Sequence, residues 1–148
     1  MRKLMQASLI AMMFATPAAW AQSASAVGLW KTIDDETGKP KALVRITEEN
    51  GALSGKIEKL FSAPNEDPNP KCVACEDSRK NQPIIGMTIV TGLKKDGNEY
   101  TGGEILDPKK GKVYKSKATL RDGGQKLEVR GYIGAPMFGR SQVWQREQ

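Results

Sequence analysis

The only two cysteines of the 148-residue chain, Cys72 and Cys75, form a Cys-x-x-Cys motif. Such a pair can form a disulfide, act as a thiol–disulfide redox site, or supply two of the four ligands of a zinc ion. A redox site of this kind needs a cysteine at the start of a helix after a strand, whereas this motif is flanked by Pro70-Lys71 and Glu76-Asp77. A zinc site would have to use Glu76 and Asp77. The motif therefore favours a disulfide, with a reduced pair or a link to a partner as alternatives.

The chain contains no histidine, which excludes His-based catalytic triads, His-ligated metal sites and His proton relays. It also excludes haem attachment through Cys-x-x-Cys-His, because Glu76 follows Cys75. Asp34-Asp35-Glu36 and Glu48-Glu49 contain the carboxylates that acid–base catalysis would need, but both runs abut turns, where solvated acids are usual. We therefore expect a protein that is not an enzyme and that holds neither a metal nor a cofactor.

Arg130 and Tyr132 are candidate ligand-contacting residues, because they could bind an acidic head group through charge-assisted hydrogen bonds. They alternate with Val129 and Gly131 along one predicted strand. If Val129 faces the interior of the protein, Arg130 and Tyr132 are exterior, and the reverse register would turn both inward. A shift of one residue reverses every side chain of a strand, so both registers remain open at this stage.

The N-terminus predicts export. Arg2 and Lys3 precede an apolar run, residues 4–15, that is too short to span a bilayer, and Ala19-Trp20-Ala21 is a small-x-small cleavage site. We predict a cleaved signal peptide at residues 1–21, with a cut after Ala26 as the alternative. The mature protein would then be periplasmic or secreted, without a transmembrane segment, in a compartment where disulfides persist.

The charge pattern does not indicate a nucleic-acid partner. The net charge of +6 falls to +4 when the two cations of the leader are removed. The lysines are spread along the chain and form no cluster typical of a nucleic-acid footprint. The sequence makes no prediction of oligomeric state.

After the leader, the chain consists of short segments of alternating apolar and polar residues, separated by turns such as Asn50-Gly51. We predict eight strands, at residues 27–32, 42–48, 52–60, 88–93, 99–106, 112–120, 126–133 and 139–146. Each strand has one polar face, which favours antiparallel pairing, and a closed barrel would leave no exposed edges. The expected fold is an all-β, eight-stranded antiparallel barrel in a single domain, residues 27–146.

Residues 61–83 interrupt the rhythm of strands. This stretch contains both cysteines and four of the eight prolines. A connection of such length is usually a functional lid or a loop that is tied down. We expect a long loop that covers one mouth of the barrel, with residues 83–87 as its apolar return.

The first predicted strand contains Gly28-Leu29-Trp30, and the last contains Arg140, Trp144 and Arg146 on one face. These two ends of the predicted domain resemble the closure of a lipocalin-type (calycin) barrel. In such barrels the tryptophan of the first strand plugs one end and an arginine of the last strand lies across its ring, a contact worth roughly 0.5–2 kcal/mol. By this resemblance one of Arg140 and Arg146 caps Trp30, and the other faces solvent.

A series of short motifs spans residues 27–146. The motifs are Gly28-Leu29-Trp30-Lys31-Thr32, Gly38-Lys39-Pro40, residues 51–56, Cys72 with Cys75, Ile85-Gly86-Met87, residues 102–108, residues 129–134 and Gly139-Arg140. By these motifs the chain is similar to the domain-of-unknown-function 2147 (DUF2147) family. The resemblance implies a secreted or periplasmic bacterial protein with a lipocalin-like barrel. It supplies no catalytic residues. Ser141 stands where the family pattern suggests threonine, and a hydroxyl is retained.

Two functions fit these expectations. The first is an exported, non-enzymatic binding protein whose barrel holds a small apolar or amphipathic ligand. The alternative is an interaction module with a solid barrel, which would bind a protein or an envelope surface through the loop at residues 61–83 and an exposed patch of Phe61, Ile84 and Ile85. An apolar cavity would favour the first function, and a close-packed interior the second.

Overall fold

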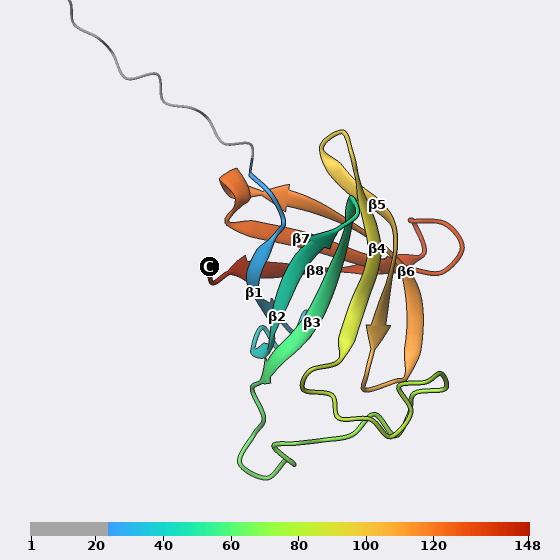
Figure 1. Ribbon diagram of the computed structural model, residues 1–148. Helices are drawn as coiled ribbons and strands as arrows, with labels where there is room; N and C mark the ends of the chain where they lie inside the picture. The colour runs from blue at the N-terminus through green and yellow to red at the C-terminus, as the bar shows by residue number, and fades with distance from the viewer. Residues whose placement is uncertain (1–23) are drawn as a thin grey trace, which may run out of the picture.

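The computed structural model describes residues 24–148, which form a closed barrel in which each strand pairs with the next and the last pairs with the first (Figure 1). All pairs are antiparallel. The elements are β1 (Gly28–Ile33), β2 (Pro40–Glu49), β3 (Ala52–Leu60), β4 (Thr88–Asp96), β5 (Glu99–Asp107), β6 (Lys112–Arg121), the 3-10 turn η1 (Asp122–Gly124), β7 (Lys126–Tyr132) and β8 (Gly139–Arg146). The predicted eight-stranded antiparallel barrel is confirmed.

The predicted signal peptide at residues 1–21 lies outside the described residues. Within residues 24–148, no helix has the length and apolar character that crossing a membrane requires.

The strand boundaries differ from the predicted ones mainly in β4, which continues past Leu93 to Asp96. Lys94 and Lys95 pair with Thr101 and Tyr100, so the hairpin turn is confined to Gly97-Asn98. The end of this hairpin is solvent-exposed, and backbone pairing there does not depend on an apolar inward side chain. The two adjacent lysines, Lys94 and Lys95, were therefore compatible with a strand as well as with a turn.

The inward faces of the strands form one hydrophobic core. Its largest fully buried side chains are those of Trp30 and Trp144, and buried aliphatic residues such as Val44, Ile57 and Leu127 pack around them. Successive side chains of a strand point to opposite faces, and one face of every strand lies against this core. This explains why apolar and polar residues alternate in the sequence. Burying these side chains is the main source of the free energy that stabilises the barrel.

One end of the barrel is closed by Trp30. Its indole Nε1 donates a hydrogen bond to the Ala26 carbonyl oxygen at 2.8 Å, and the guanidinium of Arg146 lies 4.3 Å from the centre of its ring. Arg146 also donates to the carbonyl oxygens of Gly124 at 2.7 Å and Val27 at 2.9 Å. Arg146, and not Arg140, is thus the arginine that lies over Trp30.

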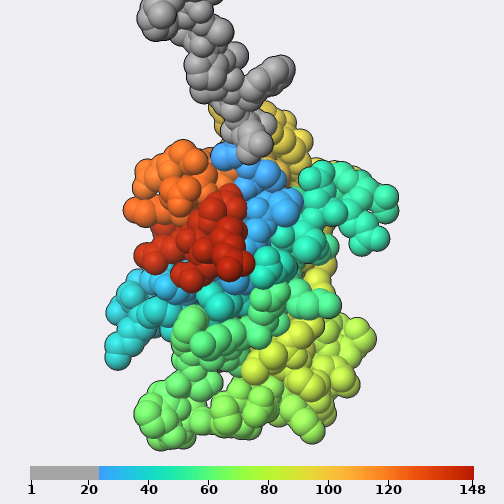
Figure 2. Space-filling model, turned by 60° about the vertical axis from the view of Figure 1, so that its left-hand side comes forward, coloured from blue at the N-terminus to red at the C-terminus, as the bar shows by residue number. Residues whose placement is uncertain are grey.

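The opposite end carries the β1–β2, β3–β4, β5–β6 and β7–β8 loops, because successive antiparallel strands alternate in direction. We call it the open end. The longest of these loops, residues 61–87, projects beyond the barrel in Figure 2, where β1 also lies beside β8. Only Trp30–Arg146 and Lys31–Gln145 pair across β1 and β8, so this seam is not hydrogen-bonded toward the open end.

Candidate ligand-binding site

A cavity of about 1350 Å³ enters the barrel from the open end. Most strands of the barrel contribute apolar residues to its wall. These residues are Val44, Ile57, Ile89, Ile105, Leu106, Val129 and Trp144. Ile89 and Leu106 lie one residue from strand ends at the open end, and Val44, Val129 and Trp144 lie deeper. The volume includes the mouth and exceeds the roughly 300–1,000 Å³ typical of small-molecule sites. The interior is therefore not close-packed along its whole length.

Few polar groups lie in the deep part of the cavity. The indole Nε1 of Trp144 donates to Gln142 Oε1 at 3.2 Å, and Thr32 Oγ1 accepts a hydrogen bond from the backbone N–H of Ala42 at 3.1 Å. Ser116 lies one inward position beyond Tyr114 of the cavity wall, and its fully buried hydroxyl has no hydrogen-bond partner in residues 24–148. The deep chamber is thus suited to an apolar group.

The mouth, in contrast, is lined by charged residues of both signs. The basic residues are Lys39, Lys41, Lys71, Lys109, Lys110 and Arg140, and the acidic residues are Asp34, Asp35, Glu36, Glu66, Asp67 and Asp107. They come from all the loops of the open end except the β7–β8 loop, and from the adjoining ends of strands. The six basic and six acidic side chains balance in number, so pairing among them decides only where local charge remains.

Asp34 is the first residue of the β1–β2 loop, and its hydrogen bonds stabilise the conformation of this loop. Its Oδ1 accepts the backbone N–H groups of Glu36 and Thr37, each at 2.8 Å, and its Oδ2 lies 3.6 Å from Lys41 Nζ. The hydrogen bonds from the backbone of Thr37 and Glu36, helped by the charge of Lys41, lower the pKa of Asp34 below 3.8. Asp34 is therefore an ionised loop-forming residue, which is unsuited to general acid catalysis at neutral pH.

Arg140 joins the β1–β2 loop to β8 across the unpaired part of the seam. Its guanidinium lies 2.7 Å from the Asp35 carboxylate and 3.2 Å from that of Glu36. Hydrogen bonds to Asp35 and, to a smaller extent, to Glu36 raise the pKa of the Arg140 guanidinium above its ordinary value. One guanidinium thus bridges two carboxylates of this loop and offsets one of their two negative charges.

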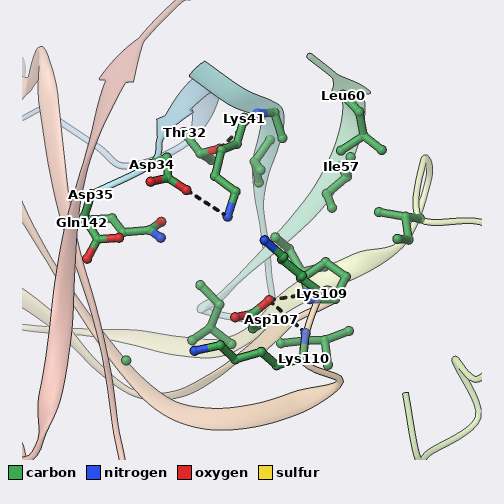
Figure 3. A pocket seen from close by; sticks show the side chains of 18 of the residues that line it. Thr32, Asp34, Asp35, Lys41, Ile57, Leu60, Asp107, Lys109, Lys110 and Gln142 are labelled. Carbon is green, nitrogen blue, oxygen red and sulfur yellow. Dashed lines mark hydrogen bonds and ion pairs between the residues drawn. The ribbon is translucent and has the colours of Figure 1, made fainter. Parts of the chain in front are cut away.

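Lys39, Lys71, Lys109 and Lys110 make no ion pair within residues 24–148. Asp107 Oδ1 accepts the backbone N–H of Lys109 at 3.0 Å and that of Lys110 at 3.3 Å, which fixes the β5–β6 turn. In Figure 3, Lys109 and Lys110 lie on the side of the mouth opposite Asp34 and Lys41. These exposed lysines are the groups of the mouth that could hold an anion.

Cys72 and Cys75 form a disulfide and are both fully buried, which confirms the prediction made from their spacing. Cys72 Sγ lies 3.4 Å from the Pro108 carbonyl oxygen, so the disulfide packs on the β5–β6 turn. The backbone also closes a bridge between Lys71 and Pro83. The loop at residues 61–87 is thus tied to the rim of the cavity at its middle.

The anchored loop has a further ionic contact away from the mouth. Arg79 Nη2 lies 2.5 Å from Asp77 Oδ2, and Arg79 Nη1 donates to the Thr88 carbonyl oxygen at 3.0 Å. Hydrogen bonds from the Arg79 guanidinium, then from its backbone N–H, lower the pKa of Asp77 to about 2. Within residues 24–148, no group of three or more His, Cys, Asp and Glu side chains is arranged to hold a metal ion.

The family of the chain follows from comparison with known proteins. The model of the family described as "Uncharacterized protein conserved in bacteria (DUF2147)" matches residues 28–146, which span the whole barrel from β1 to β8. The chain belongs to the DUF2147 family. A search of curated proteins finds no match.

Among solved structures, this DUF2147 barrel is similar to protein HP1028 from the human pathogen Helicobacter pylori, which is described as belonging to the lipocalin family. The two chains share 20% sequence identity, the match covers 84% of each, and the TM-score is 0.71. At this identity the likeness establishes a lipocalin-like fold and nothing further. The predicted family and fold resemblances are both confirmed.

The structure also shows where Arg130 and Tyr132, the candidate ligand-contacting residues, lie. Val129 is buried in the barrel, so the register is the one in which Arg130 and Tyr132 lie outside. Arg130 donates hydrogen bonds to the Pro136 carbonyl oxygen at 2.5 Å, to Ser141 Oγ at 2.9 Å and to the Gly139 carbonyl oxygen at 3.2 Å. In this structure Arg130 shapes the β7–β8 loop.

Sequence reasoning did not single out Gln142 or the lysines of the mouth. Gln142 shares its face of β8 with Trp144, so the two-residue period contained a usable signal. The lysines lie on loops far apart in the chain, and no sequence pattern indicated that they surround one opening.

Proposed function

We propose that this DUF2147 protein is an exported, non-enzymatic binding protein that holds a small apolar or amphipathic ligand in its barrel. The observation that carries the proposal is the apolar cavity, open at one end and closed at the other by Trp30 and Arg146. Each square ångström of apolar ligand surface buried there contributes roughly 25 cal/mol. The disulfide supports an oxidising compartment outside the cytoplasm.

The distribution of polar groups favours one orientation of the ligand. The apolar part would lie against Val44, Val129 and Trp144 in the deep wall. A polar or acidic head group would remain at the mouth, within reach of Lys109 and Lys110. The reverse orientation would leave a polar group in the chamber with few hydrogen-bond partners.

The alternative, a solid interaction module, is less well supported. Its predicted docking patch included Phe61, Ile84 and Ile85, and Ile84 is buried against the barrel core. Its predicted interior was close-packed, in contrast to the cavity found here.

Ligand binding is tested by incubating the protein, produced in the periplasm of a bacterial host and purified, with a bacterial lipid extract. Native mass spectrometry and thermal unfolding are then measured. We expect retained mass and a higher melting temperature, and the absence of both would overturn the proposal.

A matched pair of variants locates the site. Val129→Trp adds an indole to the cavity and should abolish retention of the ligand. Val143→Trp adds the same group to the exposed outer face of β8 and should leave retention unchanged. Equal retention by the two variants would show that the ligand does not occupy the barrel.

A further inference from the structure

The most exposed large apolar side chains of residues 24–148 gather at the open end. Met137, Val73, Phe138 and Ile133 retain 76%, 72%, 68% and 63% of their accessible surface, whereas every other exposed large apolar residue retains between 37% and 43%. Val73, Ile133 and Phe138 also line the cavity. We call these four residues the apolar rim. Exposed apolar clusters of this kind mark binding surfaces.

The apolar rim is held in place by local structure. In the β7–β8 loop, the backbone N–H of Phe138 donates to the Ala135 carbonyl oxygen at 2.9 Å, and Arg130 binds the Pro136 and Gly139 carbonyl oxygens. In the β3–β4 loop, Val73 lies between two fully buried cysteines that are bonded to each other. Both loops therefore present their apolar side chains outward on an anchored backbone.

Lysines accompany the apolar rim. Lys39, Lys71, Lys109 and Lys110 are exposed at the same mouth and make no ion pair within the described residues. Arg140 and Lys41 supply two positive charges against the three carboxylates of Asp34, Asp35 and Glu36, and the four lysines face the further carboxylates of Glu66, Asp67 and Asp107. The mouth thus carries six basic and six acidic side chains and has no net charge, so the apolar side chains would supply most of the binding and the exposed lysines would contribute local contacts with phosphate groups.

We propose that the open end docks onto an anionic phospholipid bilayer, with the apolar rim inserted at the level of the head groups and the lysines on the lipid phosphates. Apolar side chains flanked by lysines are the composition that favours the membrane interface. The four apolar side chains stand on two separate loops around an opening, an arrangement suited to a deformable partner. Docked in this way, the cavity would open directly toward the lipid.

Vesicle co-sedimentation tests the proposal without any added ligand. We expect the protein to bind vesicles that contain phosphatidylglycerol and phosphatidylcholine more strongly than vesicles of phosphatidylcholine alone. The bound fraction should fall as salt is added, because salt screens the lysines. Absence of binding to both kinds of vesicle would overturn the proposal and would leave the apolar rim as a surface for a protein partner.

Two double variants test the apolar rim. Met137→Ser with Phe138→Ser should weaken partitioning onto vesicles by about tenfold or more, since each side chain loses apolar contact with the lipid. Val27→Ser with Val143→Ser removes apolar side chains that are exposed away from the open end and should change binding little. Equal losses in the two variants would contradict docking through the open end.

A second matched pair tests the lysines. Lys109→Gln with Lys110→Gln should weaken binding to the anionic vesicles by up to about thirtyfold, on the basis of roughly 1 kcal/mol for each lysine at an anionic surface. Lys94→Gln with Lys95→Gln changes the net charge equally but lies near the opposite end, on the β4–β5 hairpin. An equal effect of both pairs would indicate nonspecific attraction and would overturn the proposal.

Retention of lipid by Met137→Ser with Phe138→Ser in native mass spectrometry separates the two proposals. If this double variant retains lipid but no longer binds vesicles, the result supports membrane docking through the apolar rim. Intact vesicle binding by a protein that retains no lipid would overturn the ligand proposal and leave docking standing. All the substituted residues are exposed, and thermal unfolding of each variant checks that it is folded.

Discussion

At the scale of single residues, the closed end depends on Trp30. Its ring is fully buried, its Nε1 is hydrogen-bonded to Ala26, and Arg146 covers its face. Arg146, near the C-terminus, in turn donates hydrogen bonds to the backbone carbonyl oxygens of Val27, just before β1, and of Gly124 in η1. One aromatic side chain thus holds together segments that are distant in sequence.

Trp30→Ala should therefore lower the free energy of unfolding more than any substitution in the β3–β4 loop. Truncating a core aromatic residue leaves a cavity and typically costs ~3–5 kcal/mol. The double variant Cys72→Ser, Cys75→Ser should cost ~2–3 kcal/mol or less, because the disulfide closes a very short ring. Denaturant melts compare the two. A less stable cysteine variant would mean that the loop is integral to the core.

Asp77 and Arg79 make the stability of the β3–β4 loop dependent on pH. Because the pKa of Asp77 in the folded protein is about 2, below its ordinary value of 3.8, its contribution is fully present above pH 3.8. That contribution is lost as the pH falls from about 4 toward 2. Arg79→Gln should move the pKa of Asp77 toward 3.8 and weaken this dependence, while the hydrogen bond from the backbone N–H of residue 79 remains. Titration of the Asp77 carboxyl by NMR measures both values, and an unchanged pKa in the variant would contradict the assignment.

At the scale of elements, the anchored loop and the β5–β6 turn form one unit at the mouth. Gly111 ends that turn with a φ of +69°, and a Cβ at this position would collide with the Ala74 carbonyl oxygen. The turn therefore needs glycine for its conformation and for its close contact with the disulfide segment.

Gly111→Ala should release the loop from the turn and make residues 61–87 more sensitive to proteolysis. Gly38→Ala is the matched control, because Gly38 has a φ of +71° and no heavy atom within 4 Å of the added Cβ. The two variants share the backbone strain, of order 1 kcal/mol, and differ only in the collision. Limited proteolysis and thermal unfolding compare them. Equal behaviour would mean that the contact with Ala74 does not anchor the loop.

At the scale of the whole molecule, the barrel is closed at one end and hollow at the other. A ligand that binds only the folded barrel must raise the free energy of unfolding by mass action, by ~2.7 kcal/mol at a concentration of one hundred times its Kd. Lipid extract should accordingly shift the melting temperature of the wild-type protein and not that of Val129→Trp. Thermal unfolding over a series of extract concentrations measures the shift, and a shift common to both proteins would place the lipid elsewhere.

The sequence by itself determined the features that depend on local pattern. Two-residue alternation and turns such as Asn50-Gly51 specify strands and hairpins, and the short spacing of Cys72 and Cys75 favours a local disulfide. Gly28-Leu29-Trp30 and the other motifs of the DUF2147 pattern carried the family and the lipocalin-like barrel.

Only the tertiary structure decided the features that depend on closure and packing. Whether Val129 faces inward, and whether Arg140 or Arg146 covers Trp30, depends on the register between strands, which a shift of one residue reverses. The cavity is the volume that the inward side chains leave unfilled, and no single segment determines that volume. The lysines and the apolar rim meet at one mouth only because barrel closure brings distant loops to the same end.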